Sequence, residues 1–141
     1  MRSLARVPVA AIVWMVVVSG AAAADLKLIA NPSVKSAVIS FEEIKGVFLA
    51  TRTVLADGSR VEPVLLQSGR THDEFVKEFI GKTDAALATY YLSLVFAGRG
   101  LMPKALASER EVADYVARTQ GAVGYVSAAT DAPGVKTLRL K

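Results

Sequence analysis

The sequence VEPVLLQSGRTHDEF, residues 61–75, changes its hydrophobic pattern half-way along. Its first half is rich in β-formers and almost continuously apolar, which is typical of a strand covered on both faces. Pro63 places this segment at a sheet edge or at the start of a strand. The second half pairs Thr71 with Glu74 three residues later, the pattern of a helix capping box. The stretch therefore predicts a strand that leads through a short turn, residues 68–70, into a helix.

The same signals recur on both sides of this stretch. Further strands are predicted at residues 25–31, 123–126 and 135–140, and further helices begin at the caps Ser40, Thr83 and Ser108. Residues 98–107 are expected to form a loop. The resulting order is strand, helix, strand, three helices and two strands, which predicts an α/β domain with a mostly parallel sheet and helices packed on its faces. Four aromatic side chains are expected in its core: Phe48, Phe75, Phe79 and Tyr125.

The first 24 residues have the layout of a secretory signal peptide. Arg2 and Arg6 give a basic start, residues 7–18 are apolar without charge, and Ala22 and Ala24 have the spacing of a cleavage site before Asp25. An uncleaved anchor is the alternative, although the apolar run is short beside the roughly 20 residues of a spanning helix. We expect cleavage, leaving residues 25–141 as one domain in the periplasm.

The composition excludes several classes of function. The chain has 141 residues, no cysteine, and 17 basic against 13 acidic residues. Loss of Arg2 and Arg6 with the signal peptide leaves 15 basic and 13 acidic residues, a net charge of +2 that gives no reason to expect nucleic-acid binding. Without cysteine there is no disulfide, thiolate nucleophile or Cys-type zinc site.

No catalytic or metal site is expected. His72 is the single histidine, and its neighbours Ser68 and Asp73 cannot complete a catalytic triad, because consecutive helical residues do not face each other. We expect His72 to be solvated in the first turn of its helix. Residues 81–83, Gly-Lys-Thr, do not form a phosphate loop, since the required upstream glycine is Val76 and a helix precedes them. The protein is therefore expected to be neither an enzyme nor a holder of a cofactor.

Binding of an anion is the chemistry that the quoted stretch can support. A helix start has unpaired N–H groups and a positive dipole end. Gly69 allows close approach to the backbone, Ser68 and Thr71 offer hydroxyls, and Arg70 offers a guanidinium. These four residues form the candidate ligand site. The alternative is a plain turn, with Thr71 as a helix cap and Arg70 in solvent.

Five motifs in order resemble the periplasmic phosphate-binding proteins of ABC transporters. They are the strand exit Ile29-Ala30-Asn31-Pro32, the helix Ser40-x-x-Glu43-Ile44-x-x-Val47-Phe48, the pairs Asp57-Gly58 and Pro63-Val64, the loop Ser68-Gly69-Arg70-Thr71-x-x-x-Phe75, and the strand Gly121-Ala122-Val123-Gly124-Tyr125-Val126. In addition, Phe96-Ala97-Gly98-Arg99-Gly100-x-x-Pro103 is similar to a loop of a short, single-lobe branch of that family. The resemblance implies a single periplasmic-binding-protein lobe that binds phosphate or a related oxyanion and works with a membrane transporter or sensor.

Departures from the family pattern qualify the expected ligand. The two-lobed members close a first lobe over phosphate, and this chain lacks that lobe. Leu65 and Leu66 stand where the family often has an arginine, while Arg70 is inserted in the anion loop. A single lobe contacts one side of an anion, so weak binding is expected. The alternative is an interaction or sensory module that kept the fold and lost the ligand; an exposed apolar patch would favour it.

Overall fold

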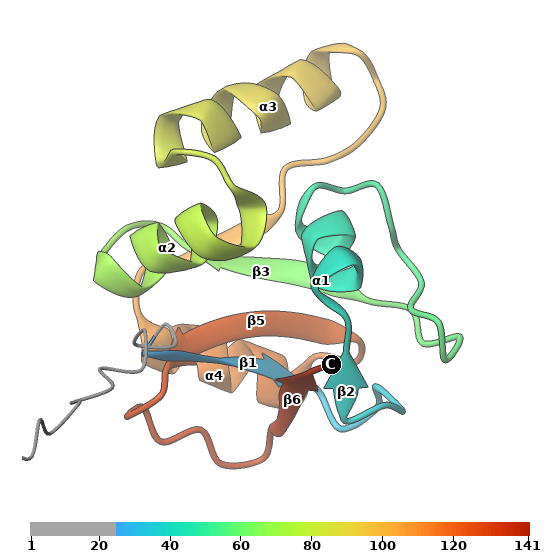
Figure 1. Cartoon of the computed structure of the whole chain (residues 1–141), viewed down its shortest axis with the longest axis vertical. Helices are drawn as coiled ribbons and strands as arrows, with labels where there is room; N and C mark the ends of the chain where they lie inside the picture. The colour runs from blue at the N-terminus through green and yellow to red at the C-terminus, as the bar shows by residue number, and fades with distance from the viewer. Residues whose placement is uncertain (1–24) are drawn as a thin grey trace, which may run out of the picture.

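The computed structural model describes residues 25–141, and the expected signal peptide, residues 1–24, lies outside them. The elements follow in this order (Figure 1): β1 (Leu26–Ala30), β2 (Val38–Ile39), α1 (Phe41–Phe48), β3 (Glu62–Leu66), α2 (Arg70–Phe75), the π-helical segment η1 (Val76–Ile80), α3 (Asp84–Phe96), β4 (Lys104–Leu106), α4 (Glu109–Arg118), β5 (Ala122–Ser127) and β6 (Lys136–Leu140). In this part of the chain, no helix has the length and apolar character needed to cross a membrane.

The six strands form one sheet in the order β2-β6-β1-β5-β3-β4. Three neighbouring pairs are parallel, namely β2 with β6, β3 with β4 and β3 with β5, whereas β1 is antiparallel to both β5 and β6. The predicted mostly parallel sheet is therefore confirmed, with β1 as the exception. Two strands escaped prediction: β2, and β4 inside the expected loop of residues 98–107. Strands of two and three residues are too short to show an alternating pattern.

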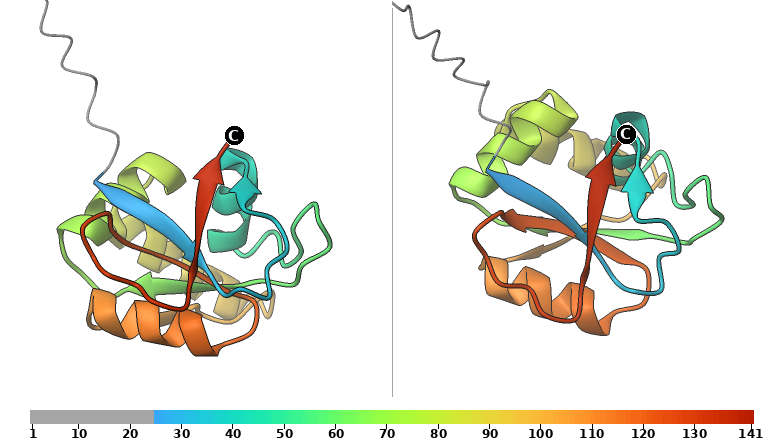
Figure 2. Two further views of the ribbon diagram at one scale, coloured as in Figure 1. Left: turned by 90° about the horizontal axis from the view of Figure 1, so that it is seen from below. Right: turned by 60° about the horizontal axis from the view of Figure 1, so that its bottom comes forward.

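Helices cover both faces of the sheet, as expected. Figure 2 shows α4 on one face and α1, α2 and α3 on the other. The packing of α4 on β5 is close at Gly124, where a Cβ would lie 3.0 Å from Val112 Cγ1 and 3.4 Å from Val116 Cγ2. The absence of a side chain at Gly124 therefore allows α4 to pack closely against β5.

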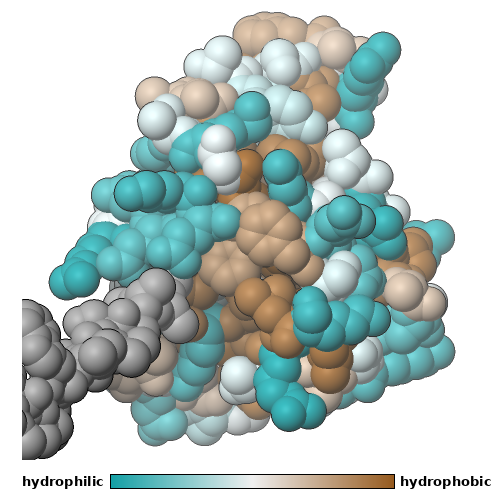
Figure 3. Space-filling model, viewed as in Figure 1, coloured by the Kyte–Doolittle hydropathy of each residue, from teal (hydrophilic) through white to brown (hydrophobic). Residues whose placement is uncertain are grey.

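The aromatic core is confirmed, because Phe48, Phe75, Phe79 and Tyr125 are all buried. Phe75 is at its centre: its ring stacks on Tyr125 at 3.8 Å between centroids, lies 5.2 Å from Phe79 and meets Phe48 edge-on at 4.7 Å. Phe41 of α1 continues the cluster outward, stacked on Phe79 at 5.9 Å and 44% exposed. Figure 3 shows apolar surface in the middle of this face, between α1 and α2.

Side-chain caps fix the helix ends. The capping boxes predicted at Ser40 and Ser108 are both formed. The C-terminal end of α4 is closed from another element, since Asn31 Nδ2 donates to the carbonyls of Val116 at 2.8 Å and Ala117 at 3.1 Å. The last carbonyls of a helix receive no hydrogen bond from within the helix itself. Asn31 thus connects the end of β1 to the C-terminal end of α4.

Candidate functional site

The predicted anion loop lies at the carboxyl end of β3. After Leu66 the strand hydrogen bonding extends by one residue, as the Gln67 amide donates to the Leu106 carbonyl at 2.9 Å. Gly69 then begins α2 with φ of 108°. Nothing lies within 4 Å of the position that a Cβ would take. Backbone conformation, and not lack of space, therefore favours glycine here.

The four predicted residues form one continuous surface segment. Ser68, Gly69 and Arg70 are exposed and Thr71 is half-buried. The expectation that Thr71 caps the helix is wrong, because Gly69 is the N-cap and no side chain caps this end. The positive φ of the glycine allows the helix to begin two residues earlier than the Thr-x-x-Glu pattern indicates. Thr71 lies in the first turn instead.

The start of α2 leaves backbone donors available. The first helical bond runs from the Asp73 amide to the Gly69 carbonyl at 3.0 Å. The amides of Arg70, Thr71 and His72 donate to no acceptor among residues 25–141. Unpaired N–H groups of this kind are the donors that an oxyanion uses at a helix start.

Arg70 already has a carboxylate partner. Its Nε lies 2.9 Å from Glu74 Oε1, one helical turn along α2, and its side chain is 84% exposed. The hydrogen bond that Arg70 donates to Glu74 raises the pKa of the guanidinium, which stays charged. An anion at the loop must therefore compete with Glu74 for this cation.

His72 is not solvated, which corrects the sequence expectation. The residue is 2% exposed and hydrogen-bonded at both ring nitrogens. Its Nδ1 lies 2.6 Å from the Tyr125 hydroxyl and its Nε2 lies 2.8 Å from Asp84 Oδ1. The missed signal is spacing: His72 precedes Phe75 by three residues and Phe79 by seven, which places it on the buried face of the helix.

His72 links Tyr125 and Asp84 in one line of hydrogen bonds. In the tautomer protonated at Nε2, the ring donates from Nε2 to the Asp84 carboxylate and accepts at Nδ1 from the Tyr125 hydroxyl. The Tyr125 oxygen in turn accepts from the Leu66 amide at 3.1 Å. Burial raises the pKa of the Tyr125 hydroxyl far above its usual value. These hydrogen bonds connect the end of β3 to α2, α3 and β5, and so hold the loop of residues 67–69 in place.

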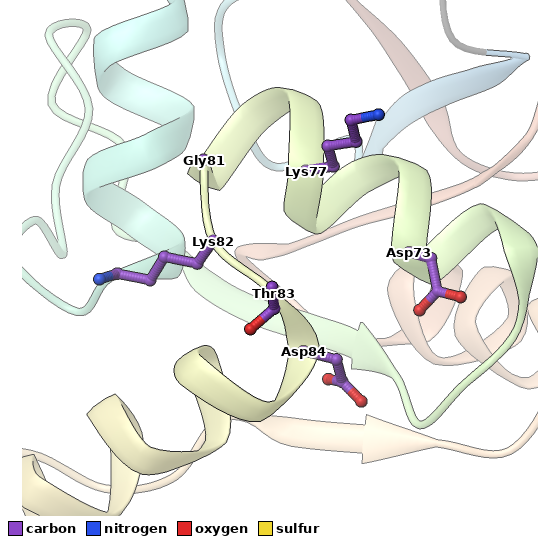
Figure 4. A pocket seen from close by; sticks show the side chains of 6 residues that line it. All are labelled: Asp73, Lys77, Gly81, Lys82, Thr83 and Asp84. Carbon is purple, nitrogen blue, oxygen red and sulfur yellow. The ribbon is translucent and has the colours of Figure 1, made fainter.

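A hollow of about 550 Å³ lies beside the turn between η1 and α3. Figure 4 shows that Asp73 and Asp84 lie on one side of it, while Lys77 and Lys82 extend away from them. Two carboxylates balance two lysines, so this hollow has no charge surplus for an anion. Its Gly81 is the left-handed C-cap of η1. As predicted, residues 81–83 follow a helix and not a strand.

No convergent set of metal ligands is found in the part of the chain that the structure describes. Residues 25–141 contain no group of three or more His, Asp or Glu side chains that could hold a metal ion.

The comparisons with known proteins concern the fold alone. No family model matches the sequence, and no curated protein matches it. Two solved structures resemble it: an ABC-type phosphate transport receptor from Vibrio cholerae (TM-score 0.60, 13% identity) and a protein described as a possible phosphate binding protein from Planctomyces limnophilus DSM 3776 (TM-score 0.56, 12% identity). The chain therefore shares its α/β fold with part of each of these two proteins.

Both likenesses cover 82% of this chain but only 45% and 41% of the other two. The chain thus spans less than half the length of either protein. The resemblance to phosphate receptors drawn from the sequence is confirmed at the level of fold. Both neighbours are described as a receptor or a binding protein, neither as an enzyme.

Proposed function

We propose that this protein is an exported solute-binding lobe that holds phosphate or a similar oxyanion weakly at Ser68, Gly69, Arg70 and Thr71. The observation that carries the proposal is the set of unpartnered amides on an exposed loop at the start of α2. Its support is the fold shared with two proteins, one described as a phosphate transport receptor and the other as a possible phosphate binding protein. The hydroxyls of Ser68 and Thr71 and the guanidinium of Arg70 complete a one-sided donor set.

The expected affinity is low. Hydrogen bonds to a charged group contribute roughly 1.5–3 kcal/mol each, and a one-sided site makes few of them. Association costs and the competing Glu74 carboxylate offset much of this gain. A dissociation constant between about 0.1 and 1 mM, roughly −4 to −5.5 kcal/mol, is the expected range.

Calorimetric titration with phosphate and sulfate tests the proposal on three variants. Arg70→Ala should weaken phosphate binding about tenfold. Glu74→Gln should strengthen it severalfold, because it releases the guanidinium from its present partner. Arg110→Ala, an exposed arginine at the start of α4, is the control and should bind as the wild type does. Absence of wild-type binding, or equal binding by wild type and Arg70→Ala, would rule out this site.

Export is part of the proposal, supported by the signal-peptide layout of residues 1–24 and by the receptor fold. Removal of these residues also removes Trp14, the only tryptophan of the chain. Protein recovered from the periplasm should begin at Asp25 and show tyrosine-only fluorescence. Periplasmic protein that begins at Met1 and shows tryptophan emission would contradict cleavage.

A second candidate, an interaction module, is favoured by the surface of α3. Leu92, Val95 and Phe96 form an exposed patch on one side of this helix, with Phe96 85% exposed. No charged residue occurs between Asp84 and Arg99. A helix that is apolar on all sides is ordinarily covered. The partner proposed for this α3 patch is an apolar surface of a membrane transporter or sensor protein.

Sedimentation with bacterial inner-membrane vesicles tests this candidate. The wild-type protein should sediment, Phe96→Ser should remain in the supernatant, and protease treatment of the vesicles should abolish the wild-type binding. Phe41→Ser, which changes the separate exposed phenylalanine on α1, is the control. Equal behaviour of Phe96→Ser and wild type would rule out the α3 patch as the docking surface.

A further inference from the structure

A second cavity lies at the opposite end of β3 from the anion loop. Its volume is about 480 Å³, within the range of small-molecule pockets. It is bounded by the end of α1 and the segment after it, by Glu62 and Pro63 at the start of β3, by residues 99–104, and by Tyr115 of α4. Figure 1 shows the two ends of β3 on opposite sides of the molecule, so the two places are separate.

The floor and one wall of this cavity are apolar. Val47 of α1 and Val61 are buried side chains that line it. Leu101 and Met102, on the loop between α3 and β4, line it as well and are 87% and 52% exposed. Apolar side chains held out in water gain free energy when a ligand covers them. The cavity therefore offers a place for an apolar body.

The rim of the cavity is cationic. Arg52, Arg99 and Lys104 line it and are exposed. Among residues 25–141, none of these three cations lies within 4.0 Å of a carboxylate. Three cations thus share the cavity with a single acid, Glu62.

That acid is already engaged. Glu62 Oε1 accepts a hydrogen bond from the Tyr115 hydroxyl at 2.5 Å. The Tyr115 ring lies beneath the Lys104 ammonium, whose Nζ is 4.8 Å from the ring centroid. This arrangement occupies Glu62 and positions Lys104 while leaving Arg52 and Arg99 available. The rim is therefore complementary to an anionic group.

We propose that this basic cavity binds an amphipathic anion, with a compact acidic head and an apolar chain or ring. The head, a carboxylate or a phosphate monoester, pairs with Arg52 and Arg99, and the apolar body lies against Val47, Val61 and the loop of Leu101 and Met102. Inorganic phosphate does not fit this description, because it has no apolar part to cover the floor. The same chemistry occurs in a free amphiphile and in the head group of an anionic lipid.

Titration of the full chain with a series of alkyl phosphates and alkyl carboxylates, below their micelle concentrations, tests the proposal. Affinity should rise roughly threefold to fourfold with each added methylene until the cavity is filled. The double variant Arg52→Gln/Arg99→Gln should weaken binding of dodecyl phosphate and dodecanoate at least tenfold. Arg110→Gln, which removes an exposed charge outside the cavity, is the matched control and should bind as the wild type does.

Two further measurements separate the sources of the ligand and the contribution of the apolar wall. Leu101→Ser should weaken binding of dodecyl phosphate and leave butyl phosphate nearly unchanged. Binding to monomeric amphiphile but not to vesicles with phosphatidylglycerol assigns the site to free ligands, and the reverse assigns it to lipid head groups. Circular dichroism verifies that each variant is folded. Absence of any chain-length dependence, or equal losses in the double variant and Arg110→Gln, would overturn the proposal.

Discussion

Tyr125→Phe is the sharpest test of the buried hydrogen-bond chain that holds the anion loop. The substitution removes one oxygen and leaves a ring that can keep its stacking on Phe75, now 3.8 Å between centroids. That oxygen accepts from the Leu66 amide at 3.1 Å and lies 2.6 Å from His72 Nδ1. The Leu66 amide and His72 Nδ1 would both lose this hydrogen-bond partner, while His72 Nε2 keeps its bond to Asp84. An unsatisfied buried polar group costs about 1–3 kcal/mol, so with two such groups the free energy of unfolding should fall by roughly 2–6 kcal/mol.

Urea denaturation followed by far-ultraviolet circular dichroism at neutral pH measures this loss. The double-mutant cycle with His72→Leu isolates the Tyr125–His72 bond, and the double variant should cost about 1–2 kcal/mol less than the two single losses added together. Hydrogen exchange of the Leu66 amide supplies a local readout, since this amide should exchange faster in Tyr125→Phe. A loss below about 0.5 kcal/mol with unchanged Leu66 exchange would refute the reasoning, because it would mean that water satisfies these groups.

Two other predictions concern the core and acid stability. Phe79→Ala should cost roughly 3–5 kcal/mol, while Phe41→Ala, on the exposed end of the same aromatic stack, should cost roughly 1 kcal/mol; equal losses in denaturation would contradict the assigned burial. The backbone hydrogen bond from Ala56 lowers the pKa of Glu43 below 4.5, so the stabilisation is present above that value and is lost as pH falls through the lowered pKa. Glu43→Gln should therefore flatten the decline in melting temperature below about pH 4.5, and the exposed neighbour Glu42→Gln should not.

The sequence carries most of the fold because local patterns determine it. The capping boxes at Ser40 and Ser108 and the apolar run of β3 are short-range features, and each has the expected structure. The boundary of α2 differs because the backbone of Gly69, rather than the Thr71 hydroxyl, begins the helix. The short strand β4 is found only through its pairing with β3, a contact between residues 40 positions apart in the case of Val64 and Lys104.

The site was harder to predict because its side chains meet across the fold. Ser68, Gly69 and Arg70 are adjacent in sequence, and their exposure at a strand-to-helix turn follows from local reasoning. The hydrogen-bond partners of His72 are Tyr125 on β5 and Asp84 at the start of α3. No short sequence motif indicates that either residue would contact His72. The basic cavity is similar, since Arg52, Glu62 and Lys104 belong to three separate segments.

The charges near residues 68–71 are the reason to expect only weak binding of an anion at the proposed site. Arg70 is the cation closest in sequence to the free amides, and Glu74 neutralises it on the same helix. Asp73, the residue before Glu74, adds a second carboxylate and lines the hollow shown in Figure 4. Backbone donors of the first turn attract an anion, but in water a short helix end contributes only about 0.3–1 kcal/mol of dipole stabilisation. Tight binding therefore requires donors from a second surface that closes over the loop, excludes water and competes with Glu74. If a partner protein supplies that surface, phosphate affinity should rise when the partner is added, and by linkage phosphate should strengthen the partner's binding by the same factor.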